Sequence, residues 1–164
     1  EAKIVGSEVK GILDLSAPAG TFRLTAVADR IEKLDDGTLA VVDYKTGSAP
    51  KKQEIESGFS PQLSVEAVIA EAGGFENIDA AKTSEFAIWK LTGGKDAGEV
   101  IGFKQLDVPV AVEKTRTGLR GFIAAFDDPT MAYRSRPRPD SAPRFSDYEH
   151  LARIKEWSAG GGDD

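Results

Sequence analysis

The chain has 164 residues, which is enough for one domain with a buried core, or for one domain with a tail. It has no cysteine and one histidine, His150, so disulfides, thiolate metal sites, iron–sulfur clusters and zinc sites built from several histidines are excluded. No apolar run approaches the roughly 20 residues that span a bilayer, so we expect no membrane partner. Hydrolytic chemistry here must therefore use carboxylates, lysine and a hard metal ion, and a reducing cytoplasm is the expected setting.

Charge is unevenly distributed along the chain. Acidic residues outnumber basic ones 27 to 21, for a net charge of −6, and such a balance does not by itself predict nucleic-acid binding. From Lys114 to Arg144, however, seven Lys or Arg face only three acids. This run is either a solvated surface or a contact for DNA phosphates or a partner subunit. Because the first residue is Glu1 and not Met, we expect the chain to be a segment of a longer protein.

The first half of the chain predicts three strands followed by a helix. Thr46 to Gly58 contains Gly, Ser, Pro and Lys and is predicted to be a loop. Ser60 is the predicted N-cap of the helix, with Pro61 at its first position and Gly73-Gly74 at its end. The three strands, from their alternation and the turn residues between them, are Val9–Leu15, Phe22–Leu34 and Thr38–Lys45.

The second half predicts two more strands, Glu85–Leu91 and Val100–Leu106, and then an amphipathic helix from Val112 to Phe126. The Pro- and Arg-rich stretch Arg134–Arg144 is predicted to be extended, and a short helix is predicted over Asp147–Trp157. This order of elements predicts an α/β fold in which a mixed β-sheet is flanked by helices. We assign residues 1–130 to the core domain and residues 131–164 to the Pro/Arg-rich extension with its C-terminal helix.

The turn Asp35-Asp36-Gly37 allows the register of one hairpin to be predicted. A three-residue loop with Gly37 at positive φ pairs Leu34 with Thr38, and it then places Asp29 directly opposite Asp43. Lys45 lies two residues beyond Asp43, so it shares the same face of the sheet. A two-residue loop would instead put the aspartates on opposite faces.

Two adjacent carboxylates repel each other unless a cation lies between them, and Mg²⁺ prefers carboxylate and water oxygens. A lysine beside such an ion can orient or help to deprotonate an attacking water. The alternative is a surface hairpin in which Lys45 forms a salt bridge with one aspartate. Because Asp43 and Lys45 follow the apolar run Leu39–Val42, charges at that position are costly unless they are paired or used.

These residues resemble the RecB-type branch of the PD-(D/E)XK nuclease superfamily, and most of all the C-terminal nuclease domains of AddB subunits in AddAB helicase–nucleases. The resemblance runs from about Glu8 to Phe75 and resumes over Tyr148–Trp157. It rests on the combination of three sequence words, which are Ala28-Asp29-Arg30-Ile31, Val42-Asp43-Tyr44-Lys45-Thr46-Gly47 and Pro61-Gln62-Leu63.

The resemblance implies a restriction-endonuclease-like fold in which Asp29 and Asp43 bind Mg²⁺, with Mn²⁺ as an alternative, and Lys45 is the catalytic lysine. Gln62 matches a glutamine that contacts the site or the DNA, and an exposed glutamine near a helix N-terminus is the alternative. Relatives often carry an acidic residue where Glu8 stands, so Glu8 is a candidate third metal ligand. A solvated strand glutamate is the alternative, which the residues favour. Tyr44 faces away from the site by alternation and is predicted to pack.

The resemblance further implies a DNA exonuclease that acts in double-strand-break repair within a cytoplasmic, nucleoid-associated complex. Its partners would be DNA, an AddA-like helicase–nuclease subunit and the missing N-terminal part of the same chain. The iron–sulfur cluster of some AddB proteins is absent, because there is no cysteine. A helix that often precedes the first strand, and that contributes a site residue in relatives, is not seen in this segment. Two alternatives remain: a catalytically silent nuclease fold used for subunit assembly and DNA contact, and a CRISPR-associated nuclease of the same superfamily.

Overall fold

The computed structural model describes residues 2–93 and 98–134, and the chain divides into two units, Glu1–Asp128 and Pro129–Asp164. The helices and strands described below all lie in the first unit, and residues 129–134 contain none. The predicted extended stretch after Arg134 and the predicted helix Asp147–Trp157 lie outside the described residues. Among the helices that are described, none combines the length and the apolar character needed to cross a membrane.

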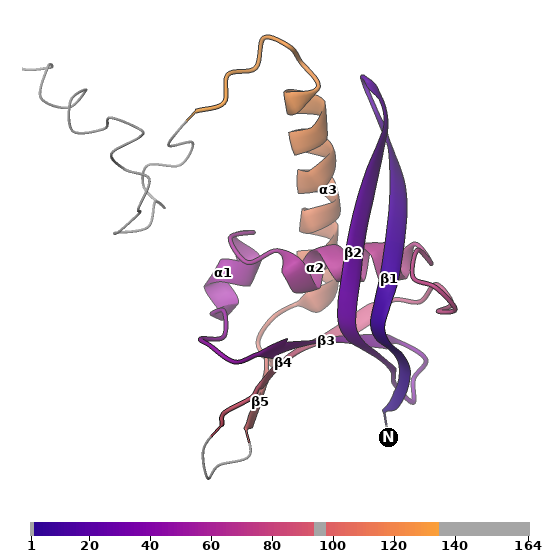
Figure 1. Ribbon diagram of the computed structural model, residues 1–164, viewed down its shortest axis with the longest axis vertical. Helices are drawn as coiled ribbons and strands as arrows, with labels where there is room; N and C mark the ends of the chain where they lie inside the picture. The colour runs from indigo at the N-terminus through magenta and orange to yellow at the C-terminus, as the bar shows by residue number, and fades with distance from the viewer. Residues whose placement is uncertain (1, 94–97, 135–164) are drawn as a thin grey trace, which may run out of the picture. The chain divides into compact units, whose positions relative to one another are not determined.

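The first unit contains a mixed five-stranded sheet with its helices packed against it (Figure 1). The strand order is β1-β2-β3-β4-β5, with β3 and β4 parallel and every other neighbouring pair antiparallel. This confirms the predicted fold class. The strands are β1 (Lys3–Ala17), β2 (Gly20–Lys33), β3 (Leu39–Lys45), β4 (Thr83–Lys90) and β5 (Glu99–Gly102), and the helices are α1 (Lys52–Glu56), α2 (Gln62–Glu71) and α3 (Val108–Phe126).

The β2–β3 hairpin has the predicted register. Leu34 and Thr38 close the loop through a hydrogen bond from Leu34 N to Thr38 O of 2.9 Å, and Gly37 has a φ of +84°. The Asp36 carboxylate accepts from the Thr38 N–H at 2.9 Å and fixes the turn. The ladder runs from Lys33 opposite Leu39 to Arg30 opposite Val42, so that the next pair in the same register is Asp29 and Asp43.

The long β1–β2 ribbon changes its inward face close to Asp29. Buried or half-buried positions of β2 alternate by two residues up to Ala28, but the next fully buried residue, Ile31, follows after three. On the paired strand, Glu8 has a positive φ of +48° between the pairs Ser7–Arg30 and Val9–Ala28. Figure 1 shows β1 and β2 rising from this region as a long ribbon away from β3, β4 and β5. Asp29 therefore lies where the ribbon departs from the regular sheet.

Helices α2 and α3 pack against each other and against the sheet. Apolar residues of β3 and β4 contact them in one buried cluster, and a second cluster joins β2 to the end of α2 and the loop after it. Ala67, Val68 and Ile69 of α2 are all fully buried, which leaves this helix almost no solvated side. The first cluster consists of Val41, Ile55, Leu63, Ala67, Val68, Phe86, Ile88, Leu106, Val108, Ala111 and Val112.

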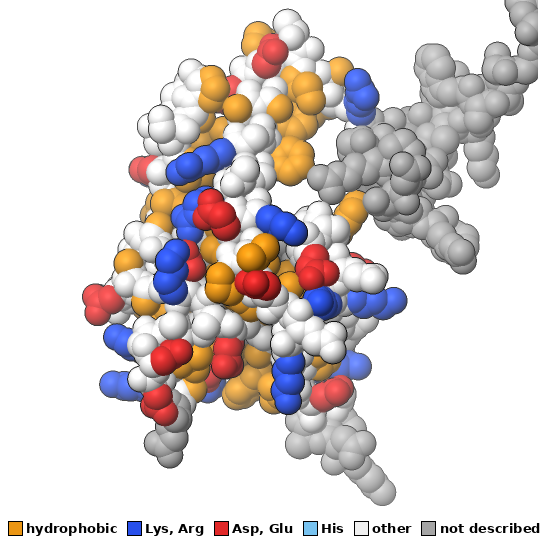
Figure 2. All heavy atoms as spheres, turned by 180° about the vertical axis from the view of Figure 1, so that it is seen from behind, with side chains coloured by type: hydrophobic (Ala, Val, Ile, Leu, Met, Phe, Trp, Pro, Cys, Tyr) orange, Lys and Arg blue, Asp and Glu red, His pale blue; other side chains and the backbone are white. Residues whose placement is uncertain are grey.

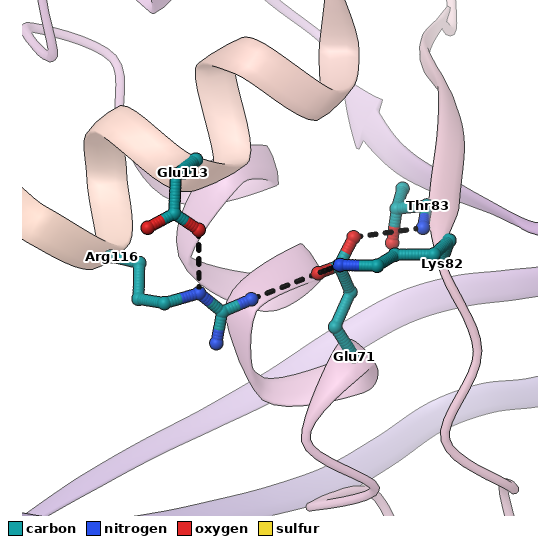
Figure 3. A network of polar contacts seen from close by, with 5 residues as sticks. All are labelled: Glu71, Lys82, Thr83, Glu113 and Arg116. Atoms are coloured by element: carbon teal, nitrogen blue, oxygen red, sulfur yellow. Dashed lines mark hydrogen bonds and ion pairs between the residues drawn. The ribbon is translucent and has the colours of Figure 1, made fainter.

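A buried glutamate at the end of α2 links that helix to α3 and β4 (Figure 3). The Glu71 side chain is 6% exposed, and its carboxylate accepts from Arg116 of α3 at 2.8 Å, from Lys82 at 3.0 Å and from the Thr83 N–H at 3.1 Å. Arg116 also donates to Glu113 at 3.2 Å. Three donors around one carboxylate supply the compensation that a buried charge requires, so this network fixes the position of α2 over the sheet.

A close backbone contact holds the segment after α2 against β1. Gly74 O accepts from Ile12 N at 2.9 Å, and Glu76 N donates to Lys10 O at 3.1 Å. A Cβ atom on Gly74 would lie 2.4 Å from Ile12 O, which leaves no room for a side chain. The predicted helix end at Gly73-Gly74 thus lies where the close approach of β1 leaves room only for a glycine.

Several predicted boundaries are wrong, and each has a physical cause. The predicted loop Thr46–Gly58 contains α1, because Ile55 inserts into the core and the Glu54 carboxylate accepts from the Lys51 N–H at 2.6 Å. The N-cap of α2 is Pro61 and not Ser60, and the Ser60 N–H instead joins the preceding turn by donating to Glu54 O.

The remaining corrections concern strand and helix lengths. β1 begins at Lys3 and not at Val9, since its pairing with β2 extends along the whole ribbon. The predicted strand Val100–Leu106 ends at Gly102, where the chain turns and Leu106 enters the core. Helix α3 begins at Val108, four residues before the prediction, because the Asp107 side chain caps it by accepting from Val110 N at 3.1 Å.

Candidate active site

The end of β3 presents one buried carboxylate and one ammonium group on the same face of the sheet. Val41 and Val42 are buried, and Asp43 follows them with only 1% of its surface exposed. Lys45 lies two residues on, and its Nζ is 2.9 Å from Asp43 Oδ2 and 3.1 Å from Asp43 Oδ1. The β-strand alternation that places Val41 in the core therefore also turns Asp43 and Lys45 toward α2.

Gln62, at the start of α2, bridges the site. Its Nε2 donates to Asp43 Oδ1 at 2.6 Å and to Glu66 Oε1 at 3.2 Å, and its Oε1 accepts from Lys45 Nζ at 3.0 Å. The residue as a whole is exposed, while its amide points inward to these partners. The glutamine singled out in the sequence thus contacts three other side chains of the site.

Asp29 approaches the site from β2 through a side-chain contact. Its Oδ2 accepts from the Tyr44 N–H at 2.9 Å, just past the last ladder pair, Arg30 and Val42. Asp29 is half-buried. The Asp29 carboxylate therefore continues the hairpin past its last backbone pair. It is held beside β3 at Tyr44, the residue between Asp43 and Lys45.

Glu66 is the site residue that the sequence reasoning did not identify. It is 3% exposed on α2, one helical turn after Gln62, so that the two side chains share a face of the helix. Its Oε1 accepts from Gln62, and its Oε2 is buried without a hydrogen-bond partner. One feature of the sequence could have indicated Glu66. It is a single charged residue within the largely apolar segment Leu63–Ala70, four residues after the candidate Gln62.

The electrostatic environment of Glu66 is strongly negative. Burial and, to a smaller extent, the negative charges of Asp43 and Asp29 raise the pKa of its carboxyl group, while the Gln62 hydrogen bond and the Lys45 charge lower it, and the net pKa is about 7. Asp29, Asp43 and Glu66 together thus bring three carboxyl groups near a single ammonium group. An additional positive charge would stabilise all three in their ionised form.

Glu8 lies on β1 between the pairs Ser7–Arg30 and Val9–Ala28, opposite Asp29, and its role as a metal ligand stays a prediction. It is exposed on β1, and within the described residues no hydrogen bond or ion pair connects it to Asp29 or Asp43. Tyr44 faces the other side of β3, where its ring packs edge-on against Trp89 with centroids 5.8 Å apart. Arg30 lies over the same Trp89 ring at 4.5 Å and pairs with Glu32. The predicted packing role of Tyr44 is confirmed.

A sequence profile of the PD-(D/E)XK nuclease superfamily matches residues 1–148 of the chain. The chain belongs to the PD-(D/E)XK nuclease superfamily. The match covers the entire sheet, the three helices and every residue of the site described above.

Proteins from Rickettsia are among those that this superfamily member resembles in sequence. An uncharacterised protein of Rickettsia bellii is 41% identical over 68 residues, which are 42% of this chain and 8% of that protein. An uncharacterised protein of Rickettsia typhi is 36% identical over 90 residues, which are 52% of this chain and 10% of that protein. The matches thus span about a tenth of these longer proteins or less. Among solved structures, the crystal structure of SSO0001 aligns with 71% of this chain and 50% of its own at 15% identity and a TM-score of 0.32, too low to support an argument.

Nucleases of this superfamily generally use Mg²⁺ or Mn²⁺, and the donors of the site are of the type that these ions prefer. Two buried carboxylate oxygens, Asp43 Oδ2 and Glu66 Oε2, accept no hydrogen bond, although Asp43 Oδ2 is in ion-pair contact with Lys45. Within residues 2–93 and 98–134, no three acidic or histidine side chains lie close enough together to coordinate one metal ion. The side-chain nitrogens of Gln62 and Lys45 donate to Asp43 instead. Carboxylate oxygens that lack donors fit a hard divalent cation.

Proposed function

We propose that this chain is a divalent-metal-dependent deoxyribonuclease domain in which Asp29 and Asp43 hold the ion and Lys45 acts on the attacking water. The observation that carries the proposal is the buried Asp43 carboxylate, which is 1% exposed, contacts Lys45 and Gln62 directly, and lies opposite Asp29 when the β2–β3 register is continued by one pair. A purely structural hairpin has no need to bury charge in this way, because apolar residues of similar size would cost less.

Each residue has a role that follows from its position. A bound divalent ion would polarise the phosphodiester and lower the pKa of a coordinated water. Asp43, fixed at the end of a buried strand, and Asp29, anchored on the Tyr44 N–H, provide oxygens with little freedom to move. Lys45 is about one-third exposed, so its ammonium group reaches both the interior carboxylate and incoming substrate, where it can orient the water and offset charge on the phosphate. Gln62 bonds to both Lys45 and Asp43 and so holds these side chains against the start of α2.

We further propose that the domain works inside a larger AddAB-like helicase–nuclease that processes DNA ends in the cytoplasm. The sequence words shared with AddB nuclease domains and the greater length of the Rickettsia relatives support this. The charge distribution supports it as well. Figure 2 shows one face on which basic and acidic side chains are interspersed without a broad basic patch, and the net charge is −6. Such a surface favours weak intrinsic DNA affinity, with most of the contact supplied by other parts of the complex.

The direct test is cleavage of end-labelled linear DNA, both single- and double-stranded, in Mg²⁺ and in EDTA. Wild-type protein should degrade DNA only with the metal, and Asp43→Asn and Lys45→Gln should each lower the rate by about 100-fold or more. The matched control is Asp14→Asn, which alters an exposed carboxylate on the same ribbon that pairs with Arg23. Cleavage by Asp43→Asn at the wild-type rate would refute the assignment. Metal binding without cleavage would favour a silent fold used for assembly and DNA contact.

A further inference from the structure

Glu66 has an arrangement that packing alone does not explain. Its neighbours along α2, Leu63, Ala67 and Val68, belong to the apolar core, and Glu66 is as buried as they are at 3% exposure. Only one of its carboxylate oxygens has a hydrogen-bond donor, the Gln62 amide, and that contact is long at 3.2 Å. The other oxygen is buried without any hydrogen bond. Burying a carboxyl group with half of its hydrogen-bonding capacity unused is costly.

The groups that face Glu66 make the burial more costly still. From β2 and β3 it experiences the negative charges of Asp29 and Asp43, and only Lys45 offsets them. The Lys45 ammonium group is bonded to Asp43 and Gln62. Within the described residues, Glu66 therefore has no cation in direct contact.

Gln62 shows how close the Glu66 and Asp43 carboxylates are. One amide nitrogen lies 2.6 Å from Asp43 Oδ1 and 3.2 Å from Glu66 Oε1, so a single atom bridges the two side chains. Carboxylate oxygens that lie this close to one another would suit a hard divalent cation. Gln62 bonds to only one of the two Glu66 oxygens, so Oε2 is left for the ion.

We propose that Glu66 is a third carboxylate ligand of the divalent ion held by Asp29 and Asp43. The inference rests on the proposed function, because it assigns one more ligand to the same ion. A bound ion would contact the Glu66 oxygen that has no hydrogen-bond donor, and it would supply positive charge beside the three carboxylates. The metal site then draws its ligands from three elements, namely β2, β3 and α2.

The test is Mn²⁺ binding measured by isothermal titration calorimetry on the 164-residue chain near pH 8, where Glu66 is ionised. Glu66→Gln keeps the size of the side chain and should weaken Mn²⁺ affinity about tenfold or more. The matched control is Glu71→Gln, the same change at the other buried glutamate of α2, which bonds to Arg116 and Thr83 away from the site. Glu71→Gln should bind Mn²⁺ as the wild type does. Circular dichroism and thermal unfolding in EDTA establish that each variant is folded.

The possible results separate this inference from the proposed function. If Asp43→Asn loses Mn²⁺ and Glu66→Gln binds within about twofold of wild type, Glu66 is not a ligand and the proposed nuclease site stands. If Glu71→Gln loses as much affinity as Glu66→Gln, the loss reflects the packing of α2, and the inference is overturned. If wild-type protein does not bind Mn²⁺, both proposals fail. Should Glu66→Gln not fold, Glu66→Asp, which keeps the charge on a shorter side chain, must still weaken binding for the inference to hold.

Discussion

Replacing Glu66 with glutamine should change how the stability of the metal-free protein depends on pH. In the folded chain, burial and the charges of Asp43 and Asp29 raise the pKa of Glu66 from 4.5 to about 7, against the opposing effects of Gln62 and Lys45. In the unfolded chain the group returns to its ordinary pKa. Between those two values the folded state holds a proton that the unfolded state has released, so rising pH favours unfolding.

The size of the effect follows from the shift. Each unit of pKa difference corresponds to 1.36 kcal/mol, so wild-type protein should lose about 3 kcal/mol between pH 4.5 and pH 7 through this one group. Glu66→Gln cannot lose a proton and should escape that loss. The free energy of unfolding of Glu66→Gln minus that of wild type should therefore increase with pH over this interval and level off above it.

The assay is urea unfolding of both proteins in EDTA at half-unit steps from pH 4.5 to pH 8.5, followed by circular dichroism. Taking the difference between the variants removes the contributions of all other titrating groups that are common to them. A difference that stays constant across the pH range would refute the reasoning, because it would mean that Glu66 titrates alike in the folded and unfolded states. A difference that falls as pH rises would show that Glu66 is ionised and stabilised in the folded protein.

Three further predictions, which use four substitutions, test the packing of the helices, each by urea unfolding. Glu71→Ala should destabilise the protein by about 3 kcal/mol, since it removes the carboxylate that accepts from Arg116, Lys82 and the Thr83 N–H, and a loss below about 1 kcal/mol would show that the network contributes little. Gly74→Ala should cost about 2 kcal/mol or more because its Cβ would collide with Ile12 O, whereas Gly121→Ala, on an open face of α3, should gain up to about 1 kcal/mol; equal effects would contradict the close contact. Asp107→Ala should cost about 1 kcal/mol by removing the cap of α3, and an unchanged stability would argue against that cap.

The sequence predicted the parts of the fold that local chemistry determines. Asp35-Asp36-Gly37 specifies its own turn, and that turn fixes which residues of β2 and β3 are opposite each other, including the step to Asp29 and Asp43. The apolar run before Asp43 predicted a buried strand, and Gly73-Gly74 predicted the end of α2. In each case a few neighbouring residues contain the whole signal.

The parts that were missed depend on contacts between distant residues. Helix α1 has five residues with only Ile55 buried, which is too short for a periodic pattern and becomes helical through its place in the core. Glu66 has an ordinary helical context, and its importance depends on Asp29 and Asp43, which lie more than 20 positions earlier in the chain. Glu8 is exposed and stands opposite Asp29 on β1, so its role as a third ligand stays a prediction.

The most direct test of the account asks whether Asp29 and Asp43 hold the same ion. Electron paramagnetic resonance can count free and bound Mn²⁺ in titrations of wild type, Asp29→Asn, Asp43→Asn and the ribbon control Asp14→Asn. If the two aspartates do hold the same ion, wild type and Asp14→Asn have one tight Mn²⁺ site, each site variant has its Mn²⁺ affinity lowered about tenfold or more, and combining the two changes lowers that affinity little further. Undiminished Mn²⁺ binding by Asp29→Asn would contradict the shared site, whatever its effect on DNA cleavage.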